Sequence, residues 1–141
     1  MRVVYPTGTR STPLDRNPST VASGTFLNQG AGGSNLNLVN YTVPANRRAD
    51  VVIQWSSLIG VALGAATTAN ITANFTPNGG AAQNLYESLF LVNQALGSRD
   101  NSPSIHLQMK AGDNITITLH IDAGAGAIQN AGGIQGVEYD A

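Results

Sequence analysis

The sequence contains no cysteine, so it holds no disulfide framework, no thiolate metal site and no cysteine nucleophile. Charge is also scarce. Asp, Glu, Lys and Arg make up 11% of the 141 residues, against about 25% in an average soluble protein. The formal net charge is -1, and Arg47-Arg48 is the only basic cluster. These values exclude the electrostatic footprint of a nucleic-acid-binding protein.

Long hydrophobic runs are missing as well. No apolar stretch approaches the roughly 18 residues that a membrane-spanning helix needs. The chain opens with Met1-Arg2 and lacks the basic-then-apolar segment of a signal peptide. We therefore expect no membrane partner, and we expect synthesis in the cytoplasm.

The residues that carry out catalysis are few and scattered. Neither a phosphate-binding loop nor a serine nucleophile elbow is present. Gly30-Ala31-Gly32-Gly33 lacks the third glycine of a dinucleotide fingerprint, and we interpret it as a flexible segment. Glu87 lies between Leu85 and Leu89, and we interpret it as a surface residue. We expect no enzymatic activity and no cofactor.

Short alternating segments separated by turn signals make up most of the chain. Residues 67–76 and 49–55 alternate apolar and polar side chains, which is typical of half-buried strands. Pro77-Asn78-Gly79-Gly80 predicts a chain reversal, because proline presets one turn dihedral and Asn-Gly tolerates positive φ. Trp55 falls on the apolar face of its segment, which predicts a core anchor. The alternative is an exposed ring that stacks on a sugar.

Residues 104–122 predict a β-hairpin with Ala111-Gly112-Asp113 as its loop, because that register puts every large apolar side chain on one face. The other face then carries His106, His120 and Asp122, a candidate metal site. A flat strand face seldom gives the convergent geometry that a metal needs. We therefore predict surface or interface histidines and no metal.

Residues 84–96 fit both a strand and a helix, since Leu85, Leu89, Val92 and Leu96 have helical spacing. The evenly spaced strands on both sides favour a strand, and residues 133–139 predict a final one. The fold prediction is all-β: an antiparallel β-sandwich, jelly-roll-like, over residues 36–141, with an extended N-terminal arm over residues 1–35.

The arm is too poor in large apolar side chains to form a core of its own. Ordering an isolated segment costs conformational entropy, so an ordered arm must dock on a partner surface. We predict that another subunit supplies this surface and that the arm contacts it through Val3, Val4, Tyr5, Leu14, Val21, Phe26 and Leu27.

An uncharged polar surface of Asn, Thr, Ser, Gln and Gly suits a protein that spends its life in a permanent assembly. The alternative that composition leaves open is an ordinary low-charge secreted domain. From the assembly interpretation we expect a homotrimer.

Two runs resemble a known family. Tyr41–Ala49 (YTVPANRRA) and Leu107–Ile117 (LQMKAGDNITI) are similar to the strand and turn patterns of small jelly-roll-like virion proteins of tailed bacteriophages. The long arm makes the chain most similar to head decoration (cement) proteins. The resemblance names no catalytic residues.

This resemblance implies a protein on the capsid exterior that binds the major capsid protein and neighbouring copies of itself. It would tie capsomers together and stabilise the DNA-filled head. The alternative is a tail-attached carbohydrate- or receptor-binding module with Trp55 or Tyr86 exposed. From the arm prediction, deletion of Met1 to Ser34 is expected to leave a folded sandwich that binds its shell weakly or not at all.

Overall fold

The structure is a computed structural model that describes residues 19–20 and 25–141. Within these residues the chain forms β-strands arranged as two antiparallel sheets, and no helix is long and apolar enough to cross a membrane. Sheet A contains β1 (Ser19–Thr20), β2 (Thr25–Ala31), β4 (Arg47–Val61), β7 (Arg99–Asn101), β8 (Ile105–Lys110) and β10 (Ala127–Asp140). Sheet B contains β3 (Asn35–Thr42), β5 (Ala69–Thr76), β6 (Gln83–Phe90) and β9 (Asn114–Ile121).

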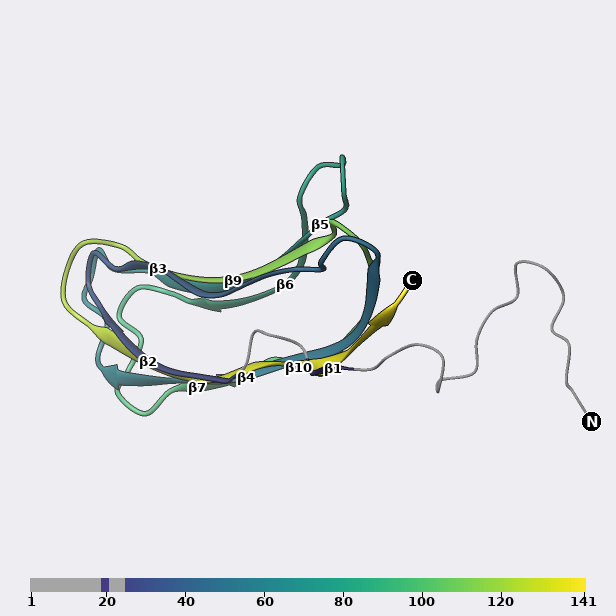
Figure 1. Ribbon diagram of the computed structural model, residues 1–141. Helices are drawn as coiled ribbons and strands as arrows, with labels where there is room; N and C mark the ends of the chain where they lie inside the picture. Colours follow the sequence, from purple (N-terminus) through teal and green to yellow (C-terminus); the bar gives the residue numbers. More distant parts are fainter. Residues whose placement is uncertain (1–18, 21–24) are drawn as a thin grey trace, which may run out of the picture.

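The two sheets lie face to face (Figure 1). Sheet A runs in the order β2-β10-β4-β8, with β1 beside β10 and β7 beside β4, and sheet B runs β3-β9-β5-β6. Most connections cross from one sheet to the other, so sequence neighbours such as β2 and β3 lie in different layers. This is the strand order of a jelly roll. The predicted all-β, jelly-roll-like sandwich is confirmed.

The core lies between the inward faces of the two sheets and is rich in β-branched side chains, which suit a pleated surface. Trp55 is buried there, and its indole Nε1 donates to the Ser88 hydroxyl of the opposite sheet at 3.0 Å. The Tyr86 ring lies 5.6 Å from the Trp55 ring, centroid to centroid. The predicted core anchor is confirmed, and the alternative of an exposed Trp55 is wrong.

The predicted hairpin over residues 104–122 is wrong in its pairing. β8 pairs with β4, whereas β9 pairs with β3 and β5, so the loop at 111–113 carries the chain from sheet A to sheet B. The inward faces were predicted correctly: Met109, Ile115 and Leu119 are buried. Alternation defines which side chains point inward. It does not tell two strands of one sheet from two strands that face each other.

Sheet A begins inside the segment 1–35 that the sequence assigned to the arm. β2 pairs with β10 from Thr25 opposite Gly133 to Ala31 opposite Ala127. Gly30 and Ala31, which we interpreted as flexible, close this strand, and Gly32 begins the turn into β3. A Cβ added to Gly30 would lie 2.6 Å from the Leu119 side chain, so the bare backbone fills the space that a side chain normally fills. The packing of Gly30 against Leu119 cannot be predicted from composition alone.

The ambiguous segment 84–96 is a strand as far as Phe90, as the sequence favoured. Ser88 and Phe90 point into the core. After Phe90 the chain turns at Asn93 and Gly97, which have φ of 60° and 85°. This turning segment, residues 91–98, connects β6 in sheet B to β7 in sheet A.

A buried hydrogen bond joins the sheets at the end of the sandwich that holds the C-terminus. The Tyr41 hydroxyl of β3 donates to Glu138 Oε1 of β10 at 2.7 Å. Arg47 Nε lies 3.4 Å from the other carboxylate oxygen, and its Nη1 donates to Asp140 at 2.9 Å. Burial, and then the Glu138 carboxylate, raise the pKa of Tyr41 above its usual value.

Replacing Tyr41 by Phe is expected to lower the free energy of unfolding by about 1 to 3 kcal/mol, because Glu138 loses its donor in a buried site. A raised folded-state pKa means that this stabilisation is complete below about pH 10 and is lost as the pH rises further. Urea unfolding at pH 8 and pH 11 tests both effects. The control is Tyr139→Phe, whose hydroxyl donates to Asp50 at the exposed surface. Equal losses in the two variants would contradict the prediction.

Candidate interaction surface

The outer face of sheet B is a field of mostly uncharged polar side chains on β3, β9 and β5, and β6 adds Glu87 and the exposed Leu89 at its edge. It arises because β5 and β9 alternate, and β3 alternates on either side of an irregularity at Leu38, so polar residues between inward apolar ones point outward. These outward positions are almost all Asn or Thr. They are Asn35, Asn37, Asn40, Thr42, Asn70, Thr72, Asn74, Thr76, Thr116 and Thr118.

Hydrogen bonds between neighbouring strands hold this field in place. Thr72 and Thr118 share a hydrogen bond of 2.8 Å across β5 and β9. The Asn114 amide donates to Asn40 Oδ1 and to Thr42 Oγ1, both at 2.8 Å. Side chains fixed in this way lose little further rotamer entropy when another surface covers them, which suits a binding face.

Glu87 and His120 are the ionisable residues on this face, with Asp122 at its margin. Glu87 is exposed and accepts from the Asn70 amide at 2.6 Å, which confirms it as a surface residue. His120 Nε2 lies 3.1 Å from Asp122 Oδ1. The hydrogen bond from Thr68, and then the one from His120, hold the pKa of Asp122 below its usual value.

His106 does not lie near His120. It is on the outer face of sheet A, opposite Val52, whereas His120 is on the outer face of sheet B. The two rings therefore point away from opposite sides of the sandwich, and the proximity behind the candidate metal site is wrong. The described residues contain no group of three or more His, Asp or Glu side chains that could hold a metal ion.

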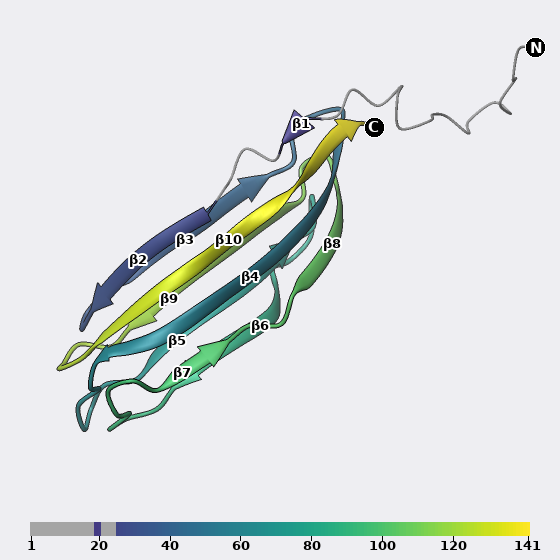
Figure 2. The same ribbon diagram turned by 90° about the horizontal axis from the view of Figure 1, so that it is seen from below.

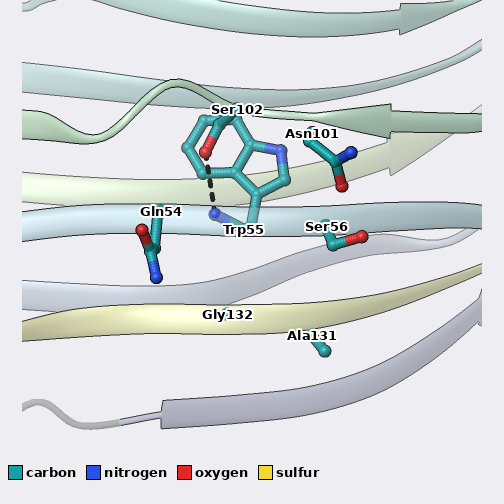
Figure 3. A pocket seen from close by; sticks show the side chains of 7 residues that line it. All are labelled: Gln54, Trp55, Ser56, Asn101, Ser102, Ala131 and Gly132. Atoms are coloured by element: carbon teal, nitrogen blue, oxygen red, sulfur yellow. Dashed lines mark hydrogen bonds between the residues drawn. The ribbon is translucent and has the colours of Figure 1, made fainter.

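The outer face of sheet A has a hollow of about 270 Å³, lined by Gln54, Trp55, Ser56, Asn101, Ser102, Ala131 and Gly132. It forms where β7 has ended and β8 has not begun, so one edge of β4 lacks a strand partner while β10 pairs with the other edge. There the Trp55 N–H donates to the Ser102 hydroxyl at 2.8 Å, with Gln54 and Ser56 to either side along β4 (Figure 3). With the Trp55 ring in the core, this hollow has no aromatic platform for a sugar.

The residues predicted to contact a partner divide into two groups. Phe26 and Leu27 lie in β2, paired with Gly132 and Ala131 of β10. The others fall outside the described residues: Val3, Val4, Tyr5, Leu14 and Val21. The sequence prediction missed the apolar end of the sandwich around residues 91–96. The signal was available, since Leu91, Val92 and Leu96 depart from strand alternation.

No protein-family model matches the sequence, and no curated protein matches it. Solved structures that match include an infectious bursal disease virus Gt strain structure, at 10% identity and a TM-score of 0.44 over 99% of this chain and 38% of that chain. Another is an infectious bursal virus T=1 particle, at 12% identity and a TM-score of 0.41 over 99% and 40%. The chain spans about two fifths of the length of these viral chains.

A third match is a subunit of the Bacillus endospore appendages, described as disulfide-linked pili. It has 12% identity and a TM-score of 0.34, over 94% of this chain and 97% of that chain. This chain has no cysteine with which to form such links.

Proposed function

We propose that this chain is a structural protein of a virus particle, and more specifically a decoration protein that binds the outer shell and ties neighbouring capsomers. Its partners would be the major capsid protein and further copies of itself, in a homotrimer. It would be made in the host cytoplasm and act on the capsid exterior. The role is mechanical, without a cofactor or a chemical step.

The observation that carries the proposal is the outer face of sheet B, which is rich in Asn and Thr and has Glu87 and His120 as its ionisable residues. Covering a charged surface requires that each ion be desolvated and paired, which often cancels the gain. Amide and hydroxyl groups can exchange water for protein partners at little net cost. Asn37, Thr72 and Thr118 lie on three adjacent strands of this face, which is therefore suited to permanent cover by a protein surface.

Two further lines support the proposal. The runs Tyr41–Ala49 and Leu107–Ile117 resemble those of phage virion proteins. The jelly roll is also used by viral capsid domains, although lectins share it, so this line is an analogy at the level of the fold. The carbohydrate-binding alternative is weakened, because Trp55 is buried and Tyr86 packs against it.

Purified protein is expected to co-sediment with shells that lack decoration and to raise the temperature at which DNA-filled heads release their DNA. Replacing Asn37 by Lys is expected to weaken shell binding by about tenfold or more, because the new charge would have to be buried unpaired. The matched control is Gln135→Lys, at an exposed position on the outer face of sheet A.

The proposal fails if intact protein does not bind shells. It also fails in its choice of face if Asn37→Lys and Gln135→Lys bind equally well. Binding to a glycan array, together with no binding to shells, would establish the carbohydrate-binding alternative.

A further inference from the structure

One end of the sandwich exposes large apolar side chains that nothing in the described part of the chain covers. Val61 is 52% exposed, Leu91 58%, Val92 43% and Leu96 67%. We call these four residues the apolar tip. A single exposed leucine needs no explanation, but several within one loop and its neighbouring strand end form a patch that marks an interaction site.

Backbone hydrogen bonds hold the tip in shape. The loop 91–98 runs alongside the end of β4, where Ile59 N–H donates to Ser98 O at 2.8 Å. Gly97 N–H donates to Ile59 O at 2.9 Å, and Leu63 N–H donates to Gln94 O at 2.9 Å. Val61 lies between Ile59 and Leu63, the two residues that make these hydrogen bonds, so it is held beside the loop. The apolar side chains are thus presented by a braced loop.

The tip is also free of charge. Residues 59–68, 91–98 and 123–126 contain no Asp, Glu, Lys or Arg, and the nearest charged residues along the chain, Arg99 and Asp122, flank these segments. The opposite end carries Arg47, Arg48, Lys110, Glu138 and Asp140. An apolar, uncharged patch favours an apolar occupant, since a charged segment would be desolvated there without a counter-ion.

Residue 19, to which residues 1–18 are joined, lies at the other end. β1 pairs with Val137 and Glu138, beside the C-terminus, whereas Val61 pairs with Ala127 at the tip end (Figures 1 and 2). The two ends are separated by the fifteen residues of β4, or about 50 Å. Residues 1–18 could reach about 60 Å if fully extended. They would span their own sandwich only when almost completely stretched.

We infer that residues 1–18 of one copy dock on the apolar tip of the next copy. The run Val3-Val4-Tyr5, which follows Arg2 and precedes Pro6, supplies the apolar contact, and packing between copies that brings a neighbouring tip closer than the chain's own would remove the need for full extension. The contact joins two different surfaces, so it is heterologous and closes into a ring when the rotation between copies allows it. The inference rests on the proposed function, in which this segment ties copies together. It adds the surface on which the segment docks, the apolar tip.

Cross-linking of the full chain tests the inference, and the absence of native cysteine makes an introduced pair unique. Val4→Cys combined with Leu96→Cys is expected to give covalent trimers after oxidation. The matched control is Val4→Cys with Val137→Cys, since Val137 is 44% exposed at the opposite end. Cross-links within one chain, or a yield no higher than in the control, would overturn the inference.

A second variant measures the energetics. Leu91→Ser combined with Leu96→Ser is expected to weaken self-association by about tenfold or more, and Val137→Ser to leave it unchanged. Light scattering across a dilution series reads out both. A trimer of unchanged affinity in the double variant would overturn the inference.

Shell binding is scored separately, so the two proposals can fail independently. If intact protein binds shells but the cross-link does not form, the tip is not the docking surface and the proposed function is unaffected. The cross-link without shell binding supports contact between copies and removes the decoration role.

Discussion

Removal of residues 1–18 is expected to leave a folded sandwich, whereas removal of residues 1–34 is expected to abolish cooperative folding. The second result reverses the expectation from composition, because β2 lies within the longer deletion and pairs with β10 along its whole length. Losing β2 leaves the β10 edge without partners and uncovers the core beside Gly30, where Leu119 packs. A folding free energy of about 5 to 15 kcal/mol cannot absorb the loss of a central strand's neighbour.

The matched variant is removal of residues 1–24, which keeps β2 and, of the strands, deletes only the short β1 beside Val137. It is expected to unfold cooperatively, close to the intact chain, and the 1–18 deletion is expected to be within about 0.5 kcal/mol of it. Urea unfolding followed by circular dichroism measures all three. A stable, cooperative 1–34 deletion would show that the sandwich does not need β2.

The shorter deletion also separates folding from assembly. If residues 1–18 tie one copy to the next, the 1–18 deletion should be folded and monomeric at concentrations where the intact chain is trimeric. Heads offered this form should release DNA at the temperature of undecorated heads, because each tie contributes through effective concentration as well as through contact. A deletion that stabilises heads as well as intact protein would remove the arm from the mechanism.

Trp55→Ala is expected to lower the free energy of unfolding by about 3 to 5 kcal/mol, because it opens a large cavity between the sheets. Trp55→Phe is expected to cost less, since it keeps most of the packing against Tyr86 but leaves the Ser88 hydroxyl without its indole donor. Because Trp55 is the only tryptophan, neither variant can be followed by tryptophan fluorescence, and urea unfolding followed by circular dichroism measures both against the intact chain.

Ser56→Ala is the control, since Ser56 is the next residue on β4 and points outward. It is expected to change stability by no more than about 0.5 kcal/mol. A stable Trp55→Ala variant that has lost binding to a glycan would show that the ring works at the surface, as the carbohydrate-binding alternative requires.

The inward faces and the turns could be predicted from the sequence because both are local properties. Ala49, Val51, Ile53 and Trp55 alternate with polar residues, and a period of two forces them onto one face whatever the partner strand is. The turns at Gly79 and Gly112 follow in the same way, since both adopt positive φ where glycine carries no steric penalty. The all-β class and the polar outer surface with few charges required nothing more.

The part of the candidate interaction surface that lies on sheet B was predictable to the same extent. Asn70, Thr72 and Asn74 are outward because Ile71 and Ala73 are inward, which the printed sequence already requires. That these residues join Thr116, Thr118 and the asparagines of β3 in one continuous field was not predictable. The field depends on the pairing of β9 with both β3 and β5, and these contacts are distant in sequence.

Only the tertiary structure decided which strands are partners. Alternation is identical for two strands of one sheet and for two strands that face each other, so residues 105–121 allowed a hairpin that the sandwich replaces with a crossing between sheets. The same crossing separates His106 from His120. Residues 25–31 form a strand because they pair with β10 in sheet A. The apolar tip is likewise a tertiary product, because hydrogen bonds from Ile59 and Leu63 hold the end of β4 beside the loop 91–98, which is distant in sequence. Side-chain period is set by the local backbone, whereas strand partnership is set by how all the strands together bury their apolar faces.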